Sequence, residues 1–207
     1  EAGVLRLLHS STVPAISLMS TLDRFAEHCP TARIDLDRAS SEEQVARVAD
    51  GEADVGIVRQ PVIRRDGRVR FVELQAEPLW AAVPAGHPLA GQASLSVQSL
   101  QHEPFVSAVY RERGGLARVV TDLCLKRGFV PLTARIVSPK TAMLNLVAAG
   151  RGVAIVPRRM TALGGQGIVY LPLSDPDAVS TCALVLPLQP TLLAQRFADL
   201  LCQERQL

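Results

Sequence analysis

Apolar and polar positions follow two alternating periods over the first 60 residues. Short strand-like runs at Val4–Leu8, Ala32–Leu36 and Asp54–Arg59 are separated by two stretches, Pro14–His28 and Ser41–Asp50, whose apolar side chains recur at helical spacing. The third run is apolar without a break at its centre, which is typical of a parallel strand covered on both faces. The order strand-helix-strand-helix-strand predicts the repeating unit of a doubly wound sheet.

The pattern changes near residue 60, where Pro61–Arg70 forms a polar, basic connection, and then resumes. We expect an α/β fold with two Rossmann-like subdomains. Residues 1–75 with 188–207 would form the first, residues 76–187 the second, with crossovers near 60–76 and 187–190. The strands expected after the change are Leu79–Val83, Pro104–Val109, Arg135–Val137, Gly152–Pro157, Ile168–Leu171 and Cys182–Leu186, and the helices are Arg113–Arg127, Pro139–Ala149 and Leu192–Gln203.

Three of the predicted strands end in small hydroxyl residues that precede a helix. These residues are Ser10, Ser11 and Thr12, then Ser40 and Ser41, then Ser138 with Thr141. A helix N-terminus presents N–H groups without intrahelical partners and a partial positive charge, so three such ends facing one another would bind a small anion. The alternative is that the hydroxyls only cap their helices, and Ser41 and Gln44 do have the spacing of a capping box.

Composition indicates a folded protein without a dedicated nucleic-acid surface. The 207 residues are 48% hydrophobic and 4% aromatic, with 22 basic and 20 acidic side chains, so we expect a sizeable, mainly aliphatic core. The charge is nearly balanced, and we interpret Arg64–Arg70 as a solvated loop. No apolar run has the length of a membrane span, and no signal peptide is evident. Because the chain lacks an initiating Met and starts almost directly in a strand, we expect a fragment or a processed product.

No pattern of catalytic or metal-binding residues stands out. The cysteines are Cys29, Cys124, Cys182 and Cys202. Their wide spacing argues against zinc and thioredoxin-like chemistry and favours a reducing compartment. The chain has no G-x-S-x-G or H-E-x-x-H motif, and Gly164–Gly167 lacks the lysine of a phosphate-binding loop. We therefore predict no catalytic residue, no metal and no cofactor, and we interpret His9 and His87 as structural.

Several segments together carry a resemblance to a known family. The most specific are the H-P-L-A element within Val83–Ala90 and the V-A-A-G-x-G-V-x-I-V-P element of Val147–Pro157. Gly3–Leu7, Phe25–Pro30 and Gly51–Ile57 add to them. Over essentially its whole length the chain resembles the effector-binding domain of LysR-type transcriptional regulators.

The resemblance implies an architecture and partners that the residues alone do not show. It implies two α/β subdomains like those of type 2 periplasmic binding proteins, with a small inducer bound in the cleft between them. It further implies a cytoplasmic protein that forms homodimers or tetramers. In such a protein an N-terminal winged helix-turn-helix, absent from this chain, reads DNA. The chain by itself is therefore expected not to bind DNA specifically.

The resemblance also implies positions for the effector. They are Ser10, Ser11, Thr12, Ser40, Ser41 and Arg59 in the first subdomain, and Phe105, Val106, Ser107, Ser138 and Thr141 in the second. Ser40–Gln44 and Gly56–Arg59 are similar to the aromatic-catabolism branch, which suggests an aromatic acid or a muconate-like dicarboxylate, although the low aromatic content limits stacking on a ring. Arg59 has two interpretations: a fork for a ligand carboxylate, or a plain surface residue beyond a strand.

Two other functions compete with that of a ligand sensor. A transport-type solute-binding protein for a small anion has a similar fold, but the cysteines and the H-P-L-A element argue against it. An enzyme on the same scaffold would need a catalytic constellation, and a fold alone specifies no chemistry.

Overall fold

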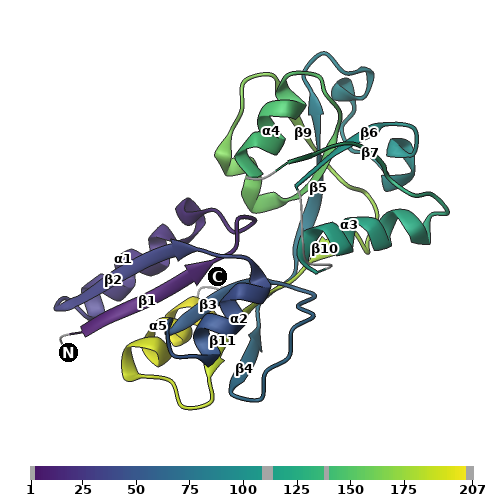
Figure 1. Cartoon of the computed structure of the whole chain (residues 1–207). Helices are drawn as coiled ribbons and strands as arrows, with labels where there is room; N and C mark the ends of the chain where they lie inside the picture. The colour runs from purple at the N-terminus through teal and green to yellow at the C-terminus, as the bar shows by residue number, and fades with distance from the viewer. Residues whose placement is uncertain (1–2, 109–113, 138–139, 204–207) are drawn as a thin grey trace. The chain divides into compact units, whose positions relative to one another are not determined.

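The computed structural model describes residues 3–108, 114–137 and 140–203, with side chains at all of them except 107–108, 133–137 and 140–141. The chain folds as two compact units, Glu1–Gln75 with Thr181–Leu207 and Ala76–Ser180 (Figure 1). The expected boundary after residue 187 is wrong, because Cys182–Pro187 forms a strand, β11, in the sheet of the first unit.

The first unit is built on a five-stranded sheet in the order β2-β1-β3-β11-β4. β1 (Gly3–His9) lies between β2 (Ala32–Arg38) and β3 (Val55–Arg59) and is parallel to both, as Figure 1 shows for β1 and β2. β11 runs antiparallel to both β3 and β4 (Val69–Glu73). The chain adds β2 on one side of β1 and β3 on the other, and open α/β sheets bind ligands beyond the carboxyl ends of the strands at such a reversal.

Helices cover the two faces of this sheet. They are α1 (Met19–His28), α2 (Ser41–Ala49) and α5 (Leu192–Gln203). α1 and α5 share one apolar core with Ile57, and within it Phe25 meets Phe197 edge to face, with 5.9 Å between ring centroids. α2 packs Val45 into a second core with Val58, the neighbour of Ile57 that points to the opposite face. Both faces of β3 are therefore buried, as its apolar run predicts.

Two segments of the first unit differ from their predicted form. The segment predicted as a helix from Pro14 begins as a 3-10 turn (η1, Ala15–Leu18), because Ser17 bonds back to the Pro14 carbonyl through its N–H (2.9 Å) and its hydroxyl (2.7 Å). The α-helix starts only at Met19. In addition, β4 occupies part of the predicted connection. Its charged residues hide the strand pattern, but an edge strand accepts them.

An ion pair explains the Gly51–Ile57 segment. Gly51 ends α2 with φ 72°, and its carbonyl accepts a hydrogen bond from Arg6 Nη1 at 2.8 Å. The buried Asp54 carboxylate accepts from Arg6 Nε at 3.1 Å, from Arg6 Nη2 at 2.7 Å and from the Arg6 backbone N–H at 2.8 Å. These bonds hold the end of α2 beside β1, so this motif is structural.

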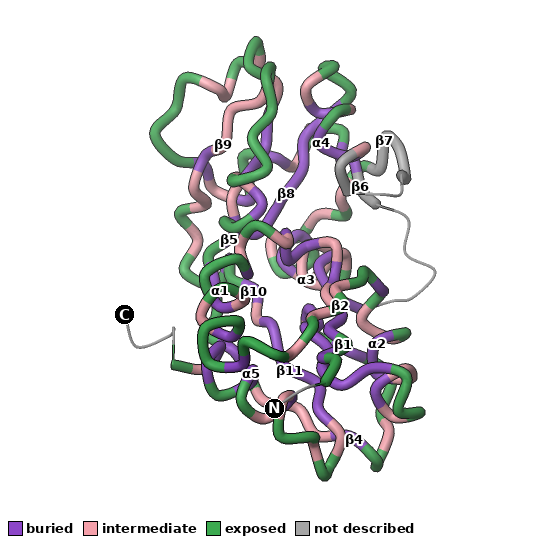
Figure 2. The backbone as a smooth tube through the Cα atoms, turned by 90° about the vertical axis from the view of Figure 1, so that its left-hand side faces the viewer, coloured by how far each residue is buried: buried purple, intermediate pink, exposed green. Residues whose placement is uncertain are grey.

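The second unit combines an antiparallel sheet with a parallel pair of strands. β5 pairs antiparallel with β8, β9 and β10, while β6 pairs parallel with β7. The strands are β5 (Glu77–Pro84), β6 (Pro104–Ala108), β7 (Leu132–Val137), β8 (Ala154–Pro157), β9 (Ile168–Pro172) and β10 (Val179–Ser180). The helices are α3 (Gly115–Lys126) and α4 (Lys140–Ala148), with 3-10 turns η2 (Pro88–Gly91), η3 (Val97–Leu100) and η4 (Arg158–Leu163). Burial is continuous along β8, and nearly so along β11 of the first unit (Figure 2).

Gly152, in the middle of the V-A-A-G-x-G element, is required by a close backbone approach. Its φ is 141°, and a Cβ at this position would lie 2.3 Å from the Pro104 carbonyl oxygen. The next residue, Val153, exchanges backbone hydrogen bonds with Pro104 and Val106 at 2.8 Å each, which ties β6 to the segment before β8. Any side chain at residue 152 would separate these two segments.

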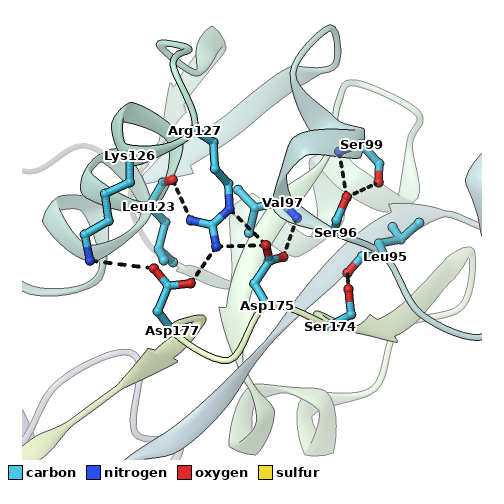
Figure 3. Close-up of polar contacts among 10 residues, drawn as sticks. All are labelled: Leu95, Ser96, Val97, Ser99, Leu123, Lys126, Arg127, Ser174, Asp175 and Asp177. Atoms are coloured by element: carbon cyan, nitrogen blue, oxygen red, sulfur yellow. Dashed lines mark hydrogen bonds and ion pairs between the residues drawn. The ribbon is translucent and has the colours of Figure 1, made fainter.

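A charged cluster fastens the end of α3 to the turn before β10. We call Arg127, Asp175 and Asp177 the Arg127 cluster (Figure 3). Arg127 Nε donates to Asp175 at 2.9 Å, Nη2 contacts both carboxylates, and Nη1 donates to the Leu123 carbonyl at 3.0 Å. Asp175 also accepts the Val97 N–H at 2.6 Å, so the cluster joins α3 and η3 to one turn.

Candidate functional site

Side chains from three segments meet at the carboxyl ends of β1, β2 and β3. The strand ends are level, because His9 pairs with Arg38 in β2 and with Ile57 in β3. The Ser10 N–H extends the pairing by donating to the Ile57 carbonyl at 3.0 Å. Ser10, Thr12, Ser41 and Arg59 lie at this edge and are linked by hydrogen bonds. We call these four residues the carboxyl-edge cluster.

Hydrogen bonds among residues 9–13 hold the turn after β1. The buried hydroxyls of Ser10 and Thr12 lie 3.0 Å apart, and the Val13 N–H donates to the Ser10 carbonyl at 2.9 Å. His9 Nδ1 lies 2.7 Å from the Val13 carbonyl, so this nitrogen carries a proton and donates it. His9 therefore has the structural role predicted for it. Ser11 is half-buried, and its hydroxyl has no hydrogen-bond partner among the described residues.

Arg59, at the end of β3, is a buried residue with 1% of its surface exposed. Its Nε donates to Thr12 Oγ1 at 3.2 Å, and its Nη2 donates to the Thr12 carbonyl at 2.9 Å. The interpretation of Arg59 as a plain surface residue is therefore wrong. One edge of the guanidinium, formed by Nε and Nη2, lies along Thr12.

The N-terminus of α2 joins the same cluster. The Ser41 hydroxyl accepts the Arg59 N–H at 3.1 Å and lies 3.4 Å from the Arg59 carbonyl. Ser40, not Ser41, is the N-cap, and its hydroxyl accepts the Glu43 N–H at 3.2 Å. The predicted capping box is therefore wrong by one residue, and Gln44 is buried, with its Nε2 donating to the Ala39 carbonyl at 3.0 Å.

The electrostatics of this edge favour negative charge. The positive end of α2 and the Arg59 guanidinium meet at the cluster. Glu42, in the first turn of α2, is turned toward a neighbouring loop, where its carboxylate accepts the N–H groups of Ile63 and Arg64 at 2.7 and 2.6 Å. Hydroxyl donors beside a helix N-terminus and a buried cation are suited to binding a small anion.

The predicted positions in the second unit are placed differently. Phe105 and Val106 are 1% and 2% exposed, and their side chains belong to two apolar cores of that unit. The Val106 N–H is bonded to the Val153 carbonyl. The side chains of Ser107 and Thr141, and the whole of Ser138, lie outside the described residues.

Gly56 in β3 leaves room for the side chain of Gln44 in α2. A Cβ on Gly56 would lie 2.9 Å from Gln44 Oε1, so only glycine leaves room for the buried glutamine side chain beneath the start of α2. A glycine inside a continuously apolar strand is the signal for such a close approach. Gly56 was not among the site residues predicted from the sequence.

Other candidate chemistry is structural or absent from the described part of the chain. His87 Nδ1 accepts the Leu89 N–H at 3.3 Å and its Nε2 lies 3.1 Å from Glu103, which explains the histidine of the H-P-L-A element as a turn residue. Among the described residues, no group of three His, Cys, Asp or Glu side chains could hold a metal ion. All four cysteines are free thiols. No helix in the described ranges is both long and apolar enough to cross a membrane.

Comparison with known proteins identifies the family of this α/β domain. The family of the LysR substrate-binding domain matches residues 1–206, so the chain belongs to that family. The regulator YnfL of Escherichia coli is 29% identical over 90% of this chain and 63% of its own length, and TtuA of Agrobacterium vitis is 30% identical over 90% and 61%. The chain thus spans about three-fifths of these curated relatives, both named as HTH-type transcriptional regulators.

Solved structures confirm the predicted fold class. The effector-binding domain of BenM with its effector benzoate superposes with a TM-score of 0.87 at 21% identity, covering 98% of this chain and 91% of that one. The effector-binding domain of QuiR in complex with shikimate gives a TM-score of 0.87 at 17% identity, covering 100% and 98%. The chain is an effector-binding domain of the LysR type, and the resemblance read from its motifs is confirmed.

Proposed function

We propose that the carboxyl-edge cluster binds a negatively charged group of the effector. The observation that carries this proposal is the convergence of Ser10, Thr12, Ser41 and Arg59 at the reversal point of the first sheet. Ser11 adds a half-buried hydroxyl beside them, and Ser40 caps the helix whose positive end faces the same edge. Ser107, Ser138 and Thr141 remain predicted contacts from the second unit.

The effector that fits best is a small carboxylate. The cluster offers hydroxyl donors and a cation, and carboxylates accept strong hydrogen bonds from such groups. Benzoate and shikimate, the molecules bound to the two structural neighbours, both carry a carboxylate. An aromatic acid or a muconate-like dicarboxylate is therefore our proposal for this chain.

In the whole protein this domain would act as the sensor of a transcriptional regulator. The effector would favour one conformation through differential contacts and thereby alter how the protein is held on DNA. DNA contact would come from a helix-turn-helix domain outside this chain, in a cytoplasmic homodimer or tetramer. The curated relatives support a regulator over a transport-type binding protein and over an enzyme.

A thermal-shift screen tests the proposed function. Benzoate, cis,cis-muconate and shikimate should each be titrated against the chain, because a ligand that binds only the folded state at about 100 times its Kd stabilises it by about 2.7 kcal/mol. We expect at least one acid to raise the Tm with rising concentration. Ser10→Ala should weaken that acid about tenfold, the worth of one hydrogen bond to a charged group.

A matched serine in the second unit serves as the control. Ser96 caps η3 by accepting the Ser99 N–H at 3.2 Å, as Ser40 caps α2 (Figure 3). Ser96→Ala should lower stability slightly and leave the affinity for the acid unchanged. The proposal fails if no acid stabilises the chain, or if Ser10→Ala and Ser40→Ala bind the acid as tightly as the wild type.

A further inference from the structure

Arg59 is placed to act on a ligand through other residues rather than directly. We propose that Arg59 and Thr12 are positioning residues that make the Ser10 hydroxyl a hydrogen-bond donor, and so select a carboxylate over a neutral ligand. This inference rests on the proposed function, because it assigns a mechanism to the same cluster.

The geometry is a chain of three groups. Arg59 donates two hydrogen bonds to Thr12. Its Nε donates to the hydroxyl at 3.2 Å, and its Nη2 donates to the carbonyl at 2.9 Å. The Thr12 hydroxyl in turn lies 3.0 Å from the Ser10 hydroxyl. All three residues are buried, with 1%, 3% and 6% of their surface exposed for Arg59, Thr12 and Ser10.

The direction of the bond between the two hydroxyls follows from hydrogen-bond chemistry. A hydroxyl has one proton to donate and two lone pairs that accept. The Thr12 oxygen already accepts from a cationic N–H, which withdraws electron density and makes its own O–H a better donor. Thr12 therefore donates to Ser10, and the Ser10 proton is left to point out of the chain of hydrogen bonds.

This direction decides which ligands the edge accepts. With Ser10 as a donor, the cluster presents a polarised O–H to an incoming carboxylate oxygen. In the reverse direction Ser10 would present a lone pair, which repels a carboxylate and suits the N–H of an amide. The buried environment strengthens the effect, since hydrogen bonds are electrostatically stronger at low dielectric.

The hydrogen bond from Arg59 to the Thr12 carbonyl helps to fix the position of the Ser10 hydroxyl. Arg59 Nη2 holds the Thr12 carbonyl, and His9 holds the next carbonyl, that of Val13, at 2.7 Å. Two consecutive peptide groups of the turn are thus fixed by side chains from β3 and β1. Ser10 lies at the start of this turn, so its hydroxyl keeps one orientation without the ligand.

The test compares each carboxylate with its uncharged carboxamide. The acid among benzoate, cis,cis-muconate and shikimate that binds the wild-type chain is titrated by calorimetry beside its amide, with Thr12→Val, Thr12→Ser, Ser10→Ala and the double variant Ser10→Ala with Thr12→Val. Thr12→Val removes only the hydroxyl at nearly constant volume. We expect it to weaken the acid about tenfold and the amide less than about twofold.

Two further results are expected from the same series. Thr12→Ser keeps the hydroxyl and should bind the acid within about twofold of the wild type. The double variant should be no weaker than the weaker single variant, because both changes remove one chain of hydrogen bonds. We call the hydrogen-bond chain from Arg59 through Thr12 to Ser10 the relay. Three results would each overturn it: losses of acid affinity that add up in the double variant, an equal loss of affinity for acid and amide, or unchanged acid binding by Thr12→Val.

A measurement on the wild type covers the case in which Thr12→Val does not fold. The Arg59 Nε–H resonance should be protected from exchange and should shift when the acid binds, because the proton lies in the relay. An unshifted resonance on saturation overturns the inference. If the wild type binds none of the three acids, the proposed function itself fails. If it binds an acid and only the relay results are negative, the proposed function stands without the relay.

Discussion

Arg59 and Arg127 present the same edge of the guanidinium group to different partners. Nε and Nη2 of Arg127 contact the carboxylates of Asp175 and Asp177, and those of Arg59 contact the two oxygens of Thr12. A carboxylate that receives an arginine completes an ion pair. A hydroxyl that accepts a hydrogen bond from an arginine still has its own proton to donate, and the arginine makes that O–H a stronger donor to the next group. This difference in partner is what we propose to separate the structural tie made by Arg127 from the ligand-binding role of Arg59.

Burial sharpens the contrast between the two clusters. Arg59 is 1% exposed, whereas the side chains of Arg127 and Asp177 are 16% and 42% exposed. Water weakens the ion pair at Asp177, so its contribution is modest, while the hydrogen bonds of Arg127 to Asp175 and to the Leu123 carbonyl are better shielded. Four predictions test the comparison, beginning with the largest expected effect.

Arg127→Met should lower the free energy of unfolding of the chain by about 2–3 kcal/mol, because it leaves the half-buried Asp175 carboxylate without its cation. Urea titration followed by circular dichroism measures the change. Arg118→Met is the matched control, since Arg118 forms an exposed pair with Asp122 within α3 and should cost less than about 0.5 kcal/mol. A loss at Arg127 no larger than that at Arg118 contradicts a structural role for the Arg127 cluster.

Arg59→Lys should reduce the affinity for the carboxylate about tenfold, or about 1.4 kcal/mol, because an ammonium group cannot grip the Thr12 hydroxyl and carbonyl together. Calorimetric titration measures it. Arg6→Lys is the control in the same unit, where Arg6 holds Asp54 with the same edge of the guanidinium. Equal losses of affinity in the two variants would show that any damage to the first unit weakens binding.

Acid should weaken the Arg127 cluster. Hydrogen bonding from Arg127 holds the pKa of Asp177 below its ordinary value of 3.8. A carboxylate whose folded pKa is depressed stabilises the fold above its unfolded pKa, and this stabilisation is lost as the pH falls through the folded pKa. Because Asp177 is exposed, we expect a loss of only about 0.5 kcal/mol below pH 4.

Urea unfolding of the wild type and of Asp177→Asn at several pH values measures the contribution of the Asp177 carboxylate to the free energy of unfolding. The difference in stability between wild type and variant should be present at pH 6 and shrink toward pH 3. A difference that grows on acidification would mean that Asp177 is not held in its charged form by Arg127.

Thiol labelling gives the smallest and most local effect. Burial raises the pKa of the Cys124 thiol to about 11, so at pH 8 this thiol is protonated and shielded from iodoacetamide. Cys202 is half-buried and should be labelled first. Arg127→Met should speed labelling of Cys124 and Arg59→Lys should not, because Cys124 lies in α3 beside Arg127. Mass spectrometry of digests gives the rates, and equal acceleration by both variants contradicts the assignment of the clusters to separate structural roles.

The element order was predictable from the sequence, but several details were not. The period of apolar residues identifies α2, and the continuous apolar run identifies β3 as a strand buried on both faces, which together with β1 indicates the α/β class. The boundary at 181–187 was not predictable, since only strand pairing shows that β11 belongs with β3. The cap moved from Ser41 to Ser40 because both residues have a hydroxyl, and one-residue register depends on backbone angles.

The candidate site was predictable as a set of residues but not as a mechanism. Three hydroxyl positions and Arg59 come directly from the strand ends. The burial of Arg59 does not, because an arginine after a strand is usually exposed, and here Thr12 supplies acceptors for it from a distant turn. Phe105 is an effector position that only the family resemblance implies, and its side chain lies in an apolar core of the second unit.

Mapping of backbone amide shifts by NMR tests most directly whether the carboxyl-edge cluster is the effector site. On addition of the acid that stabilises the chain, we predict the largest shifts in the first unit at residues 10–12 and 40–42, and about tenfold more acid should be needed to reach them in Ser10→Ala. Saturable binding with shifts elsewhere in the first unit and none at these residues would contradict it.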